Sequence, residues 1–244
     1  MSDEEVKEQQ TEPPPGILVI DIGGNSVKLW HTSHAEHLKF ESGKSLTPDE
    51  MVKQAKDHAK HWTYEKIALG IPTRVSGGRI VEDPPNLAPG WVGFHYSSSF
   101  DCPVRIMNDA SLQALGSYDG GRMLFLGLGT GVGSALIADR LVLSLDMGRI
   151  HFMEHRLFEL LGDQGFEELG VKKWTKVVME VVPFLKHAMM ADYVVLGGGN
   201  VKELPELPDG VRRGHNRTVA EGGRKLWEEL PDPSEKPCTD WLIL

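Results

Sequence analysis

The sequence contains little cysteine: Cys102 and Cys238 are the only two thiols among 244 residues. Two thiols are too few for a disulfide framework or a thiolate zinc site, so we expect no structural zinc. The sequence also lacks any apolar run near the ~20 residues that are needed to span a bilayer. These absences argue against a membrane partner and predict a cytoplasmic protein.

Positive charge is also scarce, with 26 basic residues against 35 acidic ones and a net charge of −9. A nucleic-acid partner needs a basic face, so this balance argues against one. Residues 1–15 are acidic and rich in proline, and we expect them to form a disordered tail and not a signal peptide. So short a segment leaves no room for a helix-turn-helix before the first strand, which disfavours a DNA-binding regulator.

Glycine, by contrast, is abundant and clusters in turns between apolar strands. In the stretch 122–140, predicted strands at 122–128 and 132–138 flank a turn with glycine at every second position. Little side chain covers the backbone N–H groups of such a turn, so an anion can approach them closely. The predicted phosphate cradle consists of Gly129, Thr130, Gly131 and Gly133, with the Ser134 hydroxyl beside it. A hairpin that merely turns a corner is the alternative.

Two further glycine clusters each follow a predicted buried strand. The first comprises Asp21, Gly23, Gly24 and Asn25, and the second comprises Gly197, Gly198 and Gly199. A carboxylate at the end of a buried strand is costly to desolvate, so a metal ion near Asp21 would offset that cost. Three such turns favour phosphate binding more strongly than any one of them does.

The order of predicted elements repeats along the chain. The first half contains strands at 17–21, 27–32 and 36–41, a helix at 48–61 and a strand at 66–70. The second half contains strands at 122–128, 132–138 and 141–144, a helical region at 151–189 and a strand at 192–196. The repeat predicts an α/β fold with two similar lobes and a cleft between them. The predicted parts are an N-terminal lobe at 16–107, a C-terminal lobe at 108–230 that ends in a helix at 217–230, and a C-terminal tail at 231–244.

Polar residues at two points are candidates to line that cleft. Asn86 lies in the proline-rich loop 83–91, which is either the wall of a polar ligand site or an ordinary surface crossover. Asn108 and Asp109 begin a predicted helix directly after a strand at 104–107. An acid in the first turn of a helix can simply offset the helix dipole. Here, however, the strand end would place both residues at the mouth of the crevice that the glycine turns face.

Together these motifs resemble the ROK (repressor, open reading frame, kinase) sugar kinases of the actin/hexokinase/heat-shock-protein superfamily, and among them the polyphosphate glucokinases. The first phosphate motif is matched by Asp21-Ile22-Gly23-Gly24 with Lys28, and the second by residues 128–134. Asn108-Asp109-Ala110 matches the catalytic motif, Pro85-Asn86-Leu87 with Trp91 resembles the sugar loop, and residues 195–199 resemble the donor motif. The matches keep the family's order over roughly residues 16–230.

The resemblance implies a fold of the actin-like ATPase or ribonuclease H-like type and a kinase that transfers a phosphoryl group from ATP or polyphosphate to a hexose hydroxyl. Asp109 would be the catalytic base, and Asp21 would position Mg²⁺ or its waters. Donor binding would fall to Asp21, Gly23, Gly24, Asn25, Lys28, Gly129, Thr130, Gly131, Gly133, Gly197, Gly198 and Gly199, and sugar binding to Asn86, Asn108, Asp109 and Asp146. The expected partners are the sugar and the phosphoryl donor, with a homodimer possible.

The sequence departs from the family at the site that follows the second phosphate hairpin. Asp146-Met147-Gly148-Arg149 stands where the family has Glu-Leu-Gly-His, whose acid and imidazole hold sugar hydroxyls. Aspartate is one methylene shorter than glutamate, and arginine donates hydrogen bonds but cannot accept them. Two alternatives to a hexose kinase therefore stay open: a catalytically degenerate sensor of sugar or nucleotide, and a kinase or phosphatase for another small acceptor.

Overall fold

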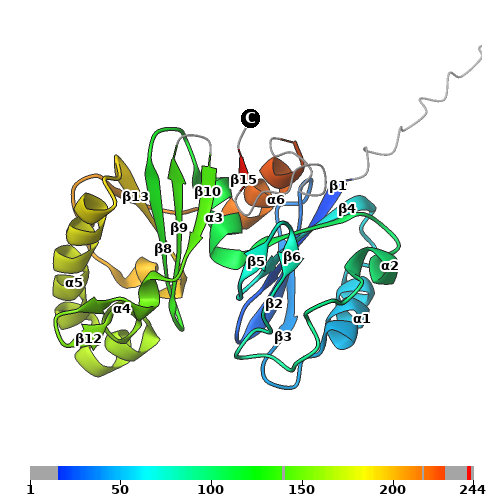
Figure 1. The fold of residues 1–244 in the computed structure, drawn as a ribbon, viewed down its shortest axis with the longest axis horizontal. Coiled ribbons are helices and arrows are strands. Elements are labelled where there is room, and N and C mark those ends of the chain that lie inside the picture. The colour runs from blue at the N-terminus through cyan, green and yellow to red at the C-terminus, as the bar shows by residue number, and fades with distance from the viewer. Residues whose placement is uncertain (1–15, 139–140, 216, 229–240, 243–244) are drawn as a thin grey trace, which may run out of the picture.

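The structure is a computed structural model that describes residues 16–138, 141–215, 217–228 and 241–242. Figure 1 shows two lobes side by side, each built around a twisted sheet, with helices α3 (Asp109–Ser117) and α6 (Thr218–Glu228) where they meet. The predicted tail at 1–15 lies outside the described residues, as does most of 231–244. Among the described residues, no helix is long and apolar enough to cross a membrane.

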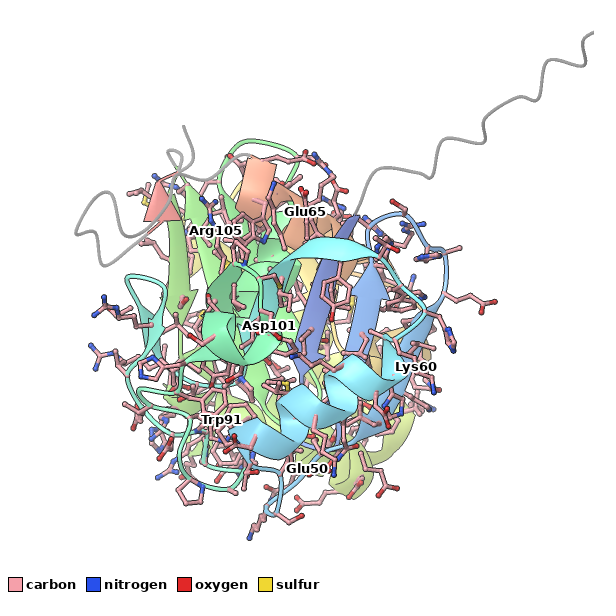
Figure 2. All side chains as sticks on the ribbon, turned by 90° about the vertical axis from the view of Figure 1, so that its right-hand side faces the viewer. Glu50, Lys60, Glu65, Trp91, Asp101 and Arg105 are labelled. Carbon is pink, nitrogen blue, oxygen red and sulfur yellow. The ribbon has the colours of Figure 1, made fainter. Side chains whose placement is uncertain are left out.

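The first lobe has a five-stranded sheet in the order β3-β2-β1-β4-β7. Its strands are β1 (Gly16–Ile22), β2 (Ser26–His31), β3 (His37–Glu41), β4 (Tyr64–Ile71) and β7 (Val104–Asn108). Apart from the antiparallel meander β1-β2-β3, the strands run parallel. Helix α1 (Pro48–His58) begins at Thr47, whose hydroxyl accepts a hydrogen bond from the Glu50 amide, and Figure 2 shows it lying across the sheet. The lobe also contains the hairpin β5 (Val75–Ser76) and β6 (Arg79–Ile80) and the short helix α2 (Tyr96–Phe100).

The second lobe repeats this plan in the order β14-β13-β8-β9-β10-β15. Its strands are β8 (Met123–Leu128), β9 (Val132–Ala138), β10 (Leu141–Leu145), β13 (Tyr193–Gly197), β14 (Val211–Arg213) and β15 (Trp241–Leu242). Again a meander, β8-β9-β10, is followed by parallel strands. The predicted α/β fold with two similar lobes is therefore confirmed. Strand β15 pairs with β10, so the described part of the predicted C-terminal tail extends this sheet.

Helices α3 and α6 join the two lobes. They approach so closely that a Cβ at Gly116 would clash with the Thr218 carbonyl and one at Gly222 with the Leu112 carbonyl. Helix α6 also packs on the sheet of the first lobe, where the Trp227 indole N–H donates to the Ile67 carbonyl at 3.2 Å. The lobe boundary between residues 107 and 108 stays a prediction, and α6 reaches across it.

The predicted helical region at 151–189 is wrong in its first residues. A hairpin of β11 (His151–Phe152) and β12 (His155–Arg156) comes first, turning through Met153 with a φ of 55°. Helices α4 (Leu157–Leu161) and α5 (Asp163–Ala188) follow, and α5 is interrupted at Gly170, where φ is 68°. Two short 3₁₀-helices, η1 (Met147–Arg149) and η2 (Gly199–Glu203), complete the lobe.

Candidate active site

Asp21 lies near the carboxyl end of β1 and is 7% exposed. It stands opposite Lys28 in the antiparallel pair of β1 and β2. Burial raises the pKa of the Asp21 carboxyl to about 6, and the Lys28 charge opposes that rise. As the sequence predicts, the structure buries a carboxylate beside the first glycine turn. This burial costs free energy because the charged group loses contact with water.

Asp109 is the first residue of α3 and lies partly buried near Asp21. The two residues flank Gly70: a Cβ there would lie 3.4 Å from the Asp109 Cα and 3.7 Å from an Asp21 carboxylate oxygen. Burial and then the Asp21 charge raise the pKa of Asp109 to about 7. Hydrogen bonds from the amides of Ala110 and Asp109 and from the Asn108 side chain oppose this rise. The carboxyl is therefore poised to exchange a proton near neutral pH.

Asn108 caps the helix that carries Asp109. Its Oδ1 accepts a hydrogen bond from the Ser111 amide at 3.1 Å, which satisfies a free N–H at the start of α3. Its Nδ2 donates to the Thr73 carbonyl at 3.3 Å, just beyond β4. Most of its hydrogen-bonding capacity thus goes to the protein and not to a sugar, the partner that the resemblance implies.

The first glycine turn meets the proline-rich loop. A Cβ at Gly24 would lie 3.9 Å from the side-chain nitrogen of Asn86, so the exposed amide of Asn86 stands next to the turn. The loop is held by Asp83, whose carboxylate accepts from the amide of buried Trp91 at 2.8 Å. Figure 2 labels Trp91 close to the start of α1. The structure therefore brings the predicted sugar residue Asn86 to the first turn.

The second glycine turn divides into an open tip and a packed base. At the tip, a Cβ on Gly129 or Gly131 would meet no atom within 4 Å. At the base, a Cβ on Gly133 would lie 3.0 Å from that of Ala110, so this glycine serves helix packing. The Ser134 hydroxyl is buried and bonds to the Leu145 carbonyl and the Met147 amide, at 3.1 and 3.0 Å, so its predicted role beside a phosphate is wrong.

The third glycine cluster divides in a similar way. A Cβ on Gly197 would press on the Phe125 ring and one on Gly198 on the Leu128 backbone, whereas Gly199 faces open space. The cluster lies near the second turn, because Asn200 donates to the Asp163 carboxylate at 2.7 Å and the Asp163 amide donates to the Gly129 carbonyl at 2.7 Å.

Asp146 follows β10 and has an exposed side chain. Its carboxylate forms an ion pair with the Nε of Arg149 at 2.7 Å. Asp146 and Arg149, which stand where the resembling motif has an acid and an imidazole, therefore contact each other.

Two further residues contact the elements that carry Asp21 and Asp109. Gly70 ends a predicted strand, but its parallel pairing with Asp21 is a long-range contact that the sequence around the glycine does not indicate. Ser144, whose hydroxyl lies 2.7 Å from that of Ser111, carries no signal in the sequence.

Comparison with known proteins supports the resemblance. No family profile matches the chain. Polyphosphate glucokinase of Mycobacterium leprae is 25% identical over 205 residues, which is 74% of this chain. The matched part spans 62% of that relative's length.

Solved structures show the same fold. The inorganic polyphosphate/ATP-glucomannokinase of Arthrobacter sp. strain KM superposes with a TM-score of 0.71 over 85% of this chain and 96% of its own, at 18% identity. The ROK-family glucokinase of Streptomyces griseus, solved with glucose and AMPPNP, gives a TM-score of 0.68 over 86% of this chain and 99% of its own, at 14% identity. The structural neighbours of the chain are thus ROK-family sugar kinases.

Proposed function

Because the chain has the fold of ROK-family sugar kinases, we propose that it transfers a phosphoryl group from ATP or polyphosphate to a hydroxyl of a hexose. The observation that carries this proposal is the placement of Asp109 beside Asp21 across Gly70. That arrangement puts a carboxyl with a pKa of about 7 next to a glycine turn and a second carboxylate.

Asp109 acts as the general base. A base works best when its pKa lies near the ambient pH, since it is then both ionised and basic enough to accept a proton. An Asp109 carboxylate oxygen accepts the proton of the attacking hydroxyl as that hydroxyl bonds to the transferred phosphorus. The bond between that phosphorus and the leaving oxygen of the donor breaks in the same transfer.

The open glycines hold the donor phosphates. Gly24, Gly131 and Gly199 expose backbone near the turns, and N–H groups in such turns favour negative charge. The Gly129 N–H donates to the Gly131 carbonyl at 3.2 Å, so Gly129 shapes the second turn. Lys28 supplies a positive charge beside the first turn. Gly197 and Gly198 would also border the donor, and their missing side chains leave room for the Phe125 ring and the Leu128 backbone.

The residues present suit Mg²⁺, although the described residues contain no cluster of three or more His, Cys, Asp or Glu side chains that could hold a metal ion. Magnesium is commonly held by one or two carboxylates together with waters and substrate phosphates. Asp21 would hold it: burial raises the pKa of this carboxyl to about 6, and a nearby cation would offset that desolvation cost. When bound, the ion would neutralise charge on the donor phosphates.

We assign the acceptor site to Asn86, Asn108, Asp109 and Asp146. Asn86 offers an exposed amide. Asn108 contributes mainly by orienting Asp109, given its bonds to the protein. The ion pair of Asp146 with Arg149 makes the preferred sugar hard to infer from glucokinases.

The test is Asp109→Asn, with Asp57→Asn as the matched control because Asp57 is exposed on α1. Hexoses would be assayed with ATP and with polyphosphate. We expect Asp109→Asn to lower kcat by about 10²–10⁴-fold, the usual contribution of a general base, while donor binding stays intact. Turnover near that of the unmodified protein would remove Asp109 as the base.

A sugar or nucleotide sensor is the alternative, favoured by the contact between Asp146 and Arg149. A sensor would be stabilised thermally by a sugar yet form no phosphorylated product with either donor. Product formation with any hexose would exclude it.

A further inference from the structure

Asp163 contacts the second glycine turn through its backbone. It is the first residue of α5, so its N–H has no partner within the helix, and this N–H donates to the Gly129 carbonyl at 2.7 Å. The residue before it lies against the same turn, because a Cβ on Gly162 would lie 3.1 Å from the Gly129 carbonyl oxygen and 3.5 Å from that of Gly131. The start of α5 therefore packs against the carbonyls of the second turn.

The side chain of Asp163 contacts the third glycine cluster. Asn200 Nδ2 donates to an Asp163 carboxylate oxygen at 2.7 Å. A carboxylate only accepts hydrogen bonds, so the nitrogen of the Asn200 amide must face it, and a bond to a charged group is stronger than one between neutral groups. Asn200 directly follows Gly199, the open glycine with which η2 begins. One residue thus contacts both of the glycine segments that the second lobe contributes to the candidate site.

The other end of η2 is held by a separate contact. Arg213 of β14 donates to the carbonyls of Val201 and Leu204. That contact ties η2 to a strand of its own sheet, whereas the bond from Asn200 ties the first turn of η2 to Asp163. Loss of the Asn200 bond should therefore loosen one end of η2 and leave the fold intact.

We propose that Asp163 is a positioning residue: it fixes the third glycine cluster against the second turn, and so sets where the phosphoryl donor lies. The inference rests on the proposed function in taking Gly131 and Gly199 as glycines that hold the donor. If the bond to Asn200 is lost, these two glycines no longer keep a fixed separation, and the donor binds less tightly. The residues assigned to the acceptor site lie outside α5 and η2, so sugar binding should not change.

The experiment compares Asp163→Ala, Asp163→Asn and Asn200→Ala, with Glu167→Ala as the control because Glu167 is an exposed acid on the same helix. The KM is measured for the donor and for the hexose. We expect Asp163→Ala and Asn200→Ala each to raise the donor KM about three- to tenfold, the range of one hydrogen bond, with the hexose KM unchanged. Asp163→Asn keeps an oxygen that can accept from Asn200, so it should restore most of the donor affinity.

The direction of the change separates positioning from two simpler roles of an acid. A carboxylate near the donor phosphates repels them, so a residue that acted only through its charge would lower the donor KM on removal. An acid that only offsets the dipole of α5 would act independently of Asn200. The double variant Asp163→Ala/Asn200→Ala should instead be no worse than either single variant. Multiplied effects, a donor KM that stays the same or falls, or equal rises in both KM values would overturn the proposal.

The contact can also be tested without turnover. The side-chain amide protons of Asn200, followed by nitrogen-15 NMR, should exchange with water about three- to tenfold faster in Asp163→Ala, and at the unchanged rate in Glu167→Ala. If no hexose is phosphorylated with either donor, the proposed function fails, and this exchange still decides whether Asp163 holds Asn200. An exchange rate that Asp163→Ala leaves unchanged would overturn the positioning role.

Discussion

The two lobes share one sheet plan but differ at the hairpin between their first two strands. In each lobe the first strand pairs antiparallel with the second and parallel with the fourth. The two hairpins can be compared at the second-last pair of facing residues before the turn. At this position the first lobe has Asp21 opposite Lys28, whereas the second lobe has Gly127 opposite Gly133. The same scaffold thus presents a pair of charges in one lobe and a pair of glycines in the other.

This difference separates two tasks. The pair Asp21 and Lys28 supplies charge beside the first turn. Gly133 supplies space, because its missing side chain lets Ala110 at the start of α3 approach the second sheet. The first lobe therefore contributes charge, and the second contributes room for the helix that carries Asp109. The predictions below test this division.

Among the changes that test this division between the lobes, the largest effect is expected when the charge of the first lobe is removed. Asp21→Asn should lower kcat by about 100-fold, as for the loss of one group that stabilises charge in a transition state. Because the Asp21 charge raises the pKa of Asp109, the acid limb of the pH profile should also move to lower pH. Rates measured across pH 5 to 9 check both effects. An acid limb that stays in place would show that the two carboxyls are not coupled.

The second prediction concerns stability against pH. Both carboxyls have pKa values above the ordinary 3.8, so the folded protein binds more protons than the unfolded chain between pH 3.8 and about 7. Their contribution to stability is therefore lost as pH rises through that window. Asp109→Asn should be more stable than the unmodified protein by about 2 kcal/mol at pH 8 and nearly equal to it at pH 4. Urea unfolding at the two pH values measures this, with Asp57→Asn expected to change neither.

The third prediction tests the room in the second lobe. Gly133→Val should destabilise the fold by about 1–3 kcal/mol, because its Cβ would press on Ala110. Gly131→Ala, at the open tip of the same hairpin, should change stability by less than about 0.5 kcal/mol. Denaturant titration of both variants compares them directly. Equal losses of stability in the two variants would mean that the base of the hairpin is no more tightly packed than its tip.

The fold could be predicted largely because its signals are local. The apolar strands, the glycine turns and the Thr47 cap each depend on a few neighbouring residues, and the repeat of their order predicts the two lobes. The hairpin at 151–156 replaces the start of the predicted helical region, because its two short strands pair across a turn. Strand β14 forms by pairing with β13, and its three residues alone do not predict this long-range contact.

The residues of the candidate site could be predicted, but the structural role of each one could not. The glycines of one turn cannot be told apart in the sequence. In the structure, Gly131 faces open space, whereas Gly133 packs against Ala110. The hydroxyl of Ser134 looked available because its partners, around Met147, come from another segment. Which atoms are already satisfied depends on tertiary contacts, and no local pattern carries that information.

The smallest effect is expected for the other half of the charged pair. Lys28→Met keeps the length of the side chain but removes the charge that opposes the raised pKa of Asp21, so that pKa should rise further. A more fully protonated Asp21 carries less negative charge and therefore raises the pKa of Asp109 less. The pKa of Asp109 should then fall slightly while the pKa of Asp21 rises. Carbon NMR of the two carboxyls resolves these shifts. Parallel movement of both carboxyls would contradict the view that Lys28 acts on Asp109 only through Asp21.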